Sequence, residues 1–319
     1  MSFFRNYQKL IVGCLCVMLL FLTAGCSIRN QKPEAAEHNW PTDDTVISLY
    51  LHQTGETVEL SLREYLYGVV AAEMDVKWPV EALAAQAVMA RTFTLEKLED
   101  GGVPERGTDA STDIHEFQAY DAGKINERVK QAVDETKNQV AVYNGELIKA
   151  WFFADGGGRT ASSALEGLSY DKEETPYIKS VEDPGASHPD NPNRSWEAAF
   201  SMKEVAEAVE QVTGIRKDTF KTVKIAERGE SGRVIRYQFD DITVGAAAFR
   251  LALGGEKLKS ALVEEIIIAE NRLLVKGKGY GHGVGMSQWG ARVLAEEGKN
   301  AQEIVQYFFE DVEIVQVQP

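Results

Sequence analysis

The chain has 319 residues, of which 44% are hydrophobic and 26% are charged, a composition typical of a globular protein of one or two domains. Its formal net charge of −15 argues against non-specific binding to nucleic acid, which requires a basic surface, so no nucleic-acid partner is expected. All three cysteines lie at or before Cys26, so residues 27–319 contain neither a disulfide nor a cysteine-based zinc site.

Residues 1–26 have the features of an export signal. A basic start precedes an apolar run over residues 10–22, and Thr23-Ala24-Gly25-Cys26 follows. Two interpretations stay open: Cys26 is lipid-modified after cleavage, or it ends an uncleaved anchor. The run is shorter than the ~20 residues that a spanning helix needs, which favours lipidation. In both cases we expect the chain at the extracytoplasmic face of the cell membrane, with the polar residues 27–44 as a linker.

The domain that follows, residues 45–319, is expected to begin with a hairpin and a helix. Val46–Leu51 and residues 57–62 alternate apolar and polar side chains around a turn that contains glycine. From Ser61 the apolar residues take a helical spacing as far as Met74, and Ser61 with Glu64 has the pattern of a capping box.

The rest of the domain mixes helices and strands without regular alternation. A second helix, rich in alanine, is expected to start at Trp78-Pro79 and to stop at Gly101-Gly102. Further helices are expected over residues 126–136, 202–212 and 246–253 and twice after the glycine-rich loop, and strands over 140–143, 147–153 and within 221–276. This pattern predicts an α+β fold of helices and antiparallel strands, arranged as two lobes around a central cleft.

Glu73 is the first candidate for chemistry. It lies in the apolar stretch 68–74 (GVVAAEM), where a carboxyl group is poorly solvated and its pKa is raised. Such a group suits a general acid near neutral pH. The alternative is a glutamate at a helix end that simply faces water.

Two polar residues interrupt the alanine-rich second helix. Gln86 and Arg91 occupy positions where apolar side chains would pack better, so each needs a polar partner. We expect Arg91 to lie near Glu73 across the helix pair. The alternative is an arginine that extends along a solvated face.

A glycine-rich motif at residues 277–285 is the second candidate. Alternate glycines surround His282 and allow the backbone to approach another segment closely, so we expect a loop that shapes the wall of the cleft. The residue order fits neither a dinucleotide-binding loop nor a Walker loop. No further metal ligands accompany His282, and no metal or other cofactor is expected. Ser287 and Gln288 are expected to begin a helix whose free amides, with the Gln288 side chain, hold sugar hydroxyl or acetamido groups.

These motifs together resemble those of the stage II sporulation protein D family. The resemblance is carried by residues 64–74 (EYLYGVVAAEM), 78–88 (WPVEALAAQAV), 90–92 (ART), 152–160 (FFADGGGRT), 175–179 (TPYIK) and 279–291 (GYGHGVGMSQWGA). It covers nearly all of residues 45–319.

The resemblance implies a membrane-anchored lytic transglycosylase that cuts peptide-free peptidoglycan glycan strands during engulfment in sporulation. Glu73 matches the family's catalytic acid. Arg91 matches a position needed for activity, and Tyr177 and Lys179 match positions that hold the glycan. Implied partners are a cell-wall amidase and membrane proteins of the engulfment machinery. The expected substrate-binding residues are Arg91, Gln86, Tyr177, Lys179, His282, Ser287 and Gln288.

A lytic transglycosylase needs one carboxyl group where most glycosidases use two. Glu73 is expected to protonate the glycosidic oxygen after N-acetylmuramic acid and then to take the proton of that sugar's C6 hydroxyl, which closes a 1,6-anhydro ring. Asp155 is the spare carboxylate for stabilising the developing oxocarbenium. A similar relation to modifiers of wall amidases gives the alternative, a glycan-binding protein that activates an amidase without turnover.

The loop at residues 112–120 (TDIHEFQAY) departs from the family. Some members carry a cysteine and histidines there that bind zinc, whereas this chain has His115 alone. We therefore expect no zinc.

Overall fold

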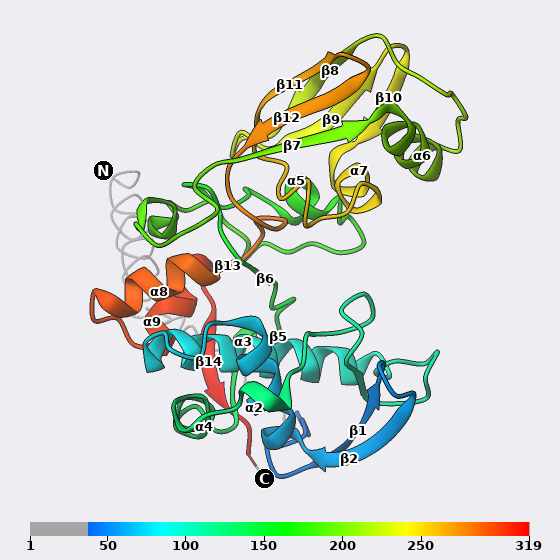
Figure 1. The fold of residues 1–319 in the computed structure, drawn as a ribbon. Coiled ribbons are helices and arrows are strands. Elements are labelled where there is room, and N and C mark those ends of the chain that lie inside the picture. The colour runs from blue at the N-terminus through cyan, green and yellow to red at the C-terminus, as the bar shows by residue number, and fades with distance from the viewer. Residues whose placement is uncertain (1–37, 319) are drawn as a thin grey trace, which may run out of the picture. The chain divides into compact units, whose positions relative to one another are not determined.

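The computed structural model describes residues 38–318, and these form an α+β fold, as the sequence predicted (Figure 1). The predicted export signal, Cys26 and most of the predicted linker lie outside the described residues. Within residues 38–318 every helix is too short or too polar to cross a membrane.

The predicted hairpin and capped helix are confirmed. Strands β1 (Val46–Leu51) and β2 (Glu56–Ser61) pair antiparallel, with Val46 opposite Ser61. Helix α2 (Leu62–Glu73) follows at once, because the Ser61 side chain accepts the Glu64 amide while the Glu64 carboxylate accepts the Ser61 amide. The helix buries most of its apolar residues and ends at Glu73.

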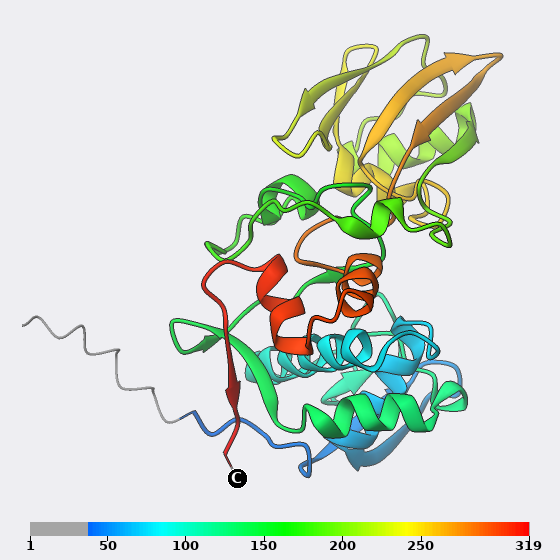
Figure 2. The same cartoon turned by 90° about the vertical axis from the view of Figure 1, so that its left-hand side faces the viewer.

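Helix α3 (Val80–Glu99) is the centre of the first hydrophobic core. Pro79 precedes it at the N-cap, as expected, and its alanines allow close approach of neighbouring helices. Figures 1 and 2 show α3 covered by α2, α8 and α9, and the described contacts also place α4 against it. The other elements around this core are β3 (Ala110–Ser111), η1 (Ala122–Lys124), α4 (Glu127–Glu135), β4 (Gln139–Tyr143), β5 (Glu146–Leu147), α8 (Gln288–Glu296), α9 (Ala301–Phe308) and β14 (Glu313–Gln316).

A small sheet of order β14-β4-β5 closes this core. Asn138, just before β4, ties together segments from the two ends of the described chain. Its side-chain oxygen accepts the amide of Asp43 at 2.8 Å, and its carbonyl accepts the amide of Val317 at 2.8 Å. Asn138 has a φ of 59°, a left-handed conformation that asparagine tolerates better than most residues.

A second hydrophobic core forms between residues 196 and 275. Two three-stranded antiparallel sheets, of order β10-β9-β8 and β11-β12-β7, are covered by two helices (Figure 1). The elements are β7 (Trp196–Ser201), α6 (Met202–Thr213), β8 (Val223–Arg228), β9 (Val234–Phe239), β10 (Ile242–Gly245), α7 (Ala246–Ala252), β11 (Val263–Ala269) and β12 (Arg272–Gly277). Two cores are therefore described, whereas a cleft between two lobes stays a prediction.

The polar connection between residues 153 and 202 holds short elements that the sequence did not predict. They are α5 (Ala164–Leu168) and η2 (Pro184–Ser187), in addition to strand β7. The strand predicted over residues 147–153 is also divided. Only Leu147 belongs to β5, residues 148–151 are not in a strand, and the last two residues form β6 (Phe152–Phe153), which pairs in parallel with β13 (Met286–Ser287). The glycine-rich loop thus leads directly into a strand next to β6.

Candidate active site

Glu73 lies at the C-terminal end of α2, where Met74 leaves the helix in an extended conformation. One carboxylate oxygen, Oε1, accepts the backbone amide of Ala119 at 3.2 Å. The other, Oε2, accepts a bond from Nε2 of Gln288 at 3.4 Å. The side chain is therefore held from two sides by segments that are 46 and 215 residues away in the sequence.

Gln288 joins Glu73 to Gln86. It is the first residue of α8, and the Ser287 side chain caps this helix by accepting the Gly290 amide at 3.1 Å. The Gln288 Nε2 also donates to Oε1 of Gln86 at 3.5 Å. Gln86 itself is fully buried in α3, and its Nε2 has no partner among the described residues. The structure thus brings together three residues that the sequence had singled out separately.

Burial raises the pKa of Glu73, and the bonds from Ala119 and Gln288 oppose this shift only in part. No cationic side chain is bonded to this carboxyl group within residues 38–318. A neighbouring cation would favour the ionised form. Glu73 therefore keeps its proton to a higher pH than an exposed glutamic acid does, which is what a general acid requires.

Arg91 lies elsewhere. Its side chain is fully buried, and Nε and Nη2 form a bidentate ion pair with Asp43 at 2.6 and 2.9 Å. Nη1 also donates to the carbonyl of Gln139 at 3.1 Å. The structure therefore does not bring Arg91 to Glu73, because the pair with Asp43 satisfies it instead. A direct contact of Arg91 with a sugar would require this ion pair to break.

Tyr177 and Lys179 are also separate from the Glu73 group, to which no hydrogen bond or ion pair joins them in the described chain. Tyr177 is buried, and its hydroxyl accepts the Lys149 amide at 2.8 Å. It lines a pocket of about 530 Å³ that is rich in carboxylates, among them Glu96 and Glu173. Lys179 pairs with Glu310 at 3.2 Å. Their expected roles in glycan binding stay predictions.

His282 is committed to the backbone around the glycine-rich loop. Its Nδ1 accepts the Val284 amide at 3.1 Å, so Nε2 carries the proton and donates to the carbonyl of Phe152 at 3.0 Å. Burial, followed by the positive charge of Arg250, lowers the pKa of His282 to about 3. A neutral imidazole with both nitrogens bonded to the backbone holds the loop in place and has neither nitrogen free for a sugar.

Asp155 is too buried to reach a sugar, with 1% of its surface exposed. Its Oδ1 accepts the Gly157 amide at 3.0 Å, and it lies close enough to Asp183 for the two carboxylates to repel each other. Burial raises the pKa of Asp183 to about 6. The hydrogen bond from Ser287 opposes this shift, and the charge of Asp155 adds to it. Asp155, the expected spare carboxylate, is therefore not exposed to a sugar in the described conformation.

Sequence reasoning missed two contributors. The amide of Ala119 had no signal, because a backbone donor leaves no trace in residue type. Asp183, which receives bonds from Gly156, Gly185 and the Ser287 side chain, holds the start of α8 in position. His115 is exposed, and no group of three potential metal ligands occurs within residues 38–318. The absence of zinc stays a prediction.

Comparison with known proteins gives two regional matches. Residues 50–143 match the family described as Stage II sporulation protein, a region that contains Glu73, Gln86 and Ala119. Residues 174–285 match a domain of unknown function, a region that contains the whole second core.

Several curated proteins are similar over most of the chain. Stage II sporulation protein D of Bacillus subtilis is 30% identical over 312 residues, which cover 91% of this chain and 87% of that protein. An uncharacterized protein of Brachyspira hyodysenteriae is 32% identical over 260 residues, 81% of this chain and 67% of that protein. The amidase enhancer of Bacillus subtilis is 27% identical over 290 residues, but these cover only 39% of its length.

Proposed function

This chain belongs to the stage II sporulation protein D family, and we propose that it is a lytic transglycosylase that cuts peptidoglycan glycan strands with Glu73 as acid and base. A role at the cell wall in sporulation is supported by the names of the relatives, Stage II sporulation protein D and amidase enhancer. The observation that carries the finer proposal is the half-buried carboxyl group of Glu73, which accepts hydrogen bonds from Ala119 and Gln288 and whose pKa is raised by burial.

The reaction uses one carboxyl group twice. Protonated Glu73 donates its proton to the oxygen of the glycosidic bond as the bond from C1 of N-acetylmuramic acid breaks. The resulting carboxylate then accepts the proton of the C6 hydroxyl of the same sugar, and the C6 oxygen bonds to C1. The products are a 1,6-anhydromuramoyl end and a free hydroxyl on the leaving sugar, and no water is consumed.

The arrangement around Glu73 suits this cycle better than a hydrolytic one. Hydrolytic glycosidases place a second carboxyl group ~5–9.5 Å from the first, as nucleophile or as base for a water molecule. Asp155, the candidate for such a group, is buried and bonded to its own loop. The amides of Ala119 and Gln288 stabilise the carboxylate that forms in the middle of the cycle, and so they help the acid to give up its proton.

The proposed substrate is a strand from which an amidase has already removed the stem peptides, so that a cell-wall amidase acts first. We place the chain at the extracytoplasmic face of the cell membrane, tethered through residues 1–26. Membrane proteins of the engulfment machinery are the further partners proposed.

The test measures anhydromuramoyl products by mass spectrometry on amidase-treated and on intact sacculi. Glu73→Gln keeps the size of the side chain but cannot cycle a proton, so product formation should fall at least ~10²-fold while folding is kept. Activity of this variant equal to that of the wild-type chain contradicts the mechanism. Equal rates on the two kinds of sacculi contradict the order of events.

The alternative is a glycan-binding protein that activates an amidase, and the similarity to the amidase enhancer favours it. In that case the chain forms no anhydro product, but it accelerates peptide release by an added amidase. Glu73→Gln would leave this acceleration unchanged, which separates the two functions in one pair of assays.

A further inference from the structure

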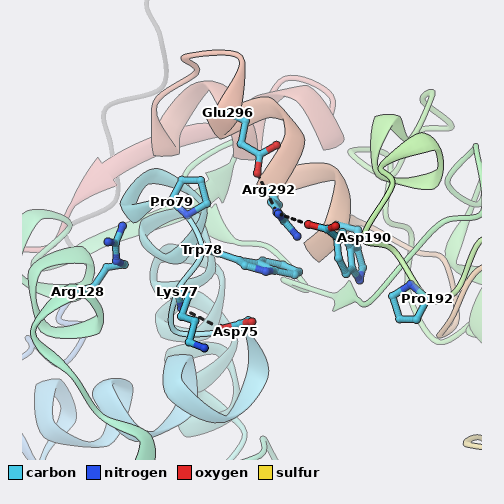
Figure 3. A pocket seen from close by; sticks show the side chains of 10 residues that line it. Asp75, Lys77, Trp78, Pro79, Arg128, Asp190, Pro192, Arg292 and Glu296 are labelled. Carbon is cyan, nitrogen blue, oxygen red and sulfur yellow. Dashed lines mark hydrogen bonds and ion pairs between the residues drawn. The ribbon is translucent and has the colours of Figure 1, made fainter.

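A pocket of about 780 Å³ adjoins the segments that carry the candidate site (Figure 3). Trp78 and Pro79 belong to the loop that follows Glu73, and Trp289 is the residue after Gln288. The pocket is therefore built from residues that lie close in sequence to Glu73 and Gln288. Its lining consists of Asp75, Lys77, Trp78, Pro79, Arg128, Asp190, Pro192, Trp289, Arg292 and Glu296.

One wall of the pocket is aromatic and firmly held. The rings of Trp78 and Trp289 meet edge to face with centroids 4.8 Å apart. The Arg292 guanidinium lies over both rings, 5.4 and 5.0 Å from their centroids, and is fixed by Asp190 at 3.0 Å and by Glu296 at 2.9 Å. Half-buried indoles kept in place by such contacts present flat apolar surface to a ligand, with little loss of side-chain freedom on binding.

The other side of the pocket carries two positively charged side chains. Figure 3 shows Lys77 and Arg128 on the side of Trp78 opposite Arg292. Both side chains are exposed, and neither has a carboxylate partner among residues 38–318. Asp75 shares this side, but one of its oxygens accepts the Lys77 backbone amide at 2.9 Å. In a chain of net charge −15, two unpaired cations beside an aromatic wall are a local exception that suits an anionic ligand.

We propose that this pocket binds an N-acetylmuramic acid residue of the glycan strand, with the sugar ring at the Trp78 and Trp289 wall and the lactyl carboxylate at Lys77 and Arg128. The inference rests on the proposed substrate. Muramic acid has a free lactyl carboxylate only when its stem peptide has been removed, because the peptide otherwise converts that group to a neutral amide. Lys77 and Arg128 thus recognise peptide removal by charge.

The experiment measures binding without turnover, using the full-length chain in detergent with Glu73→Gln as the parent. One probe is glycan strands stripped of peptide by an amidase. The other is the same strands with their lactyl carboxylates converted to methylamides. Isothermal titration calorimetry compares the parent with the pair Lys77→Gln and Arg128→Gln. The pair Lys203→Gln and Arg216→Gln, exposed positions near the second core, is the control for the same loss of charge.

The parent should bind stripped strands roughly tenfold more tightly than methylamidated strands, and this preference should shrink as salt rises. The pocket variant should lose the preference, with its affinity for methylamidated strands unchanged, while the control keeps it. Absence of a preference in the parent, equal loss with both probes, or full affinity of the pocket variant overturns the inference. Failure of the proposed function is read separately, as missing anhydromuramoyl product from the chain with Glu73 intact.

Discussion

Substituting Arg91 distinguishes most clearly between a structural and a catalytic role of this residue. Arg91→Met keeps the length and most of the apolar volume of the side chain but removes its charge. Asp43 is then left as a buried carboxylate without its partner, since both side chains are fully buried. We expect the loss of stability, and not an altered active site, to dominate the effect of this change.

The expected magnitude follows from the burial. Removing one member of a buried ion pair costs about 3–5 kcal/mol, because the remaining charge is uncompensated. In a chain of this size each kcal/mol corresponds to roughly 2–4 °C in Tm, so Tm should fall by about 10 °C. The double variant Asp43→Asn and Arg91→Met has no unpaired buried carboxylate at this position. The double variant should therefore be more stable than Arg91→Met alone.

Thermal unfolding followed by circular dichroism, with cleavage measured well below the lowest Tm, tests this reasoning. If Arg91 is structural, the folded fraction of Arg91→Met keeps a near-normal rate. A variant with unchanged Tm and no cleavage would refute the structural reasoning and would place Arg91 at the substrate.

Two further predictions concern Glu73. Gln288→Leu removes a bond that favours the ionised carboxyl group, so the pKa of Glu73 should rise further, and the basic limb of the pH–rate profile should move to higher pH as the rate falls roughly tenfold. An unmoved limb contradicts this. Burial raises the pKa of Glu73 in the folded state, so the folded protein favours the protonated carboxyl group. The free energy of unfolding therefore falls as pH rises through that pKa. Glu73→Gln should therefore raise Tm more at pH 8 than at pH 5; equal gains at both pH values would count against it.

Local signals predicted the first half of the fold well. The capping box of Ser61 and Glu64, and the helix that begins after Asn126, depend on neighbours three residues apart. Such short-range bonds can be read from residue type alone. The Asn144-Gly145 pair has the residue types of a tight hairpin turn, and it joins β4 to β5.

Two elements that depend on distant partners, β6 and β14, were not predicted. The run 147–153 looks like one strand, but β6 leaves it to pair with β13, more than 130 residues later. β14 is a strand because β4 accepts it as a neighbour, and its own sequence between two polar ends gave no strong sign. Propensity is a weak guide where pairing decides the outcome.

The candidate site was predicted in part for a similar reason. Glu73, Gln86 and Gln288 were singled out because a polar residue in an apolar helix and a glutamine at a helix start both leave a pattern in the sequence, and the structure places them together. Their meeting at one point could not be read from spacing. The expectation for Arg91 failed in geometry because its partner, Asp43, lies in a polar segment with no distinguishing feature.

The two hydrogen bonds that Asn138 accepts, from the amides of Asp43 and Val317, affect how the chain folds during synthesis. Synthesis delivers residues in order, so β4 emerges about 170 residues before β14, its partner on one side. Until then the Val317 amide cannot reach Asn138, and one edge of β4 is open. An open edge can pair between molecules. Late closure thus keeps the nascent domain unfinished, and in need of protection from self-association, until its final strand arrives.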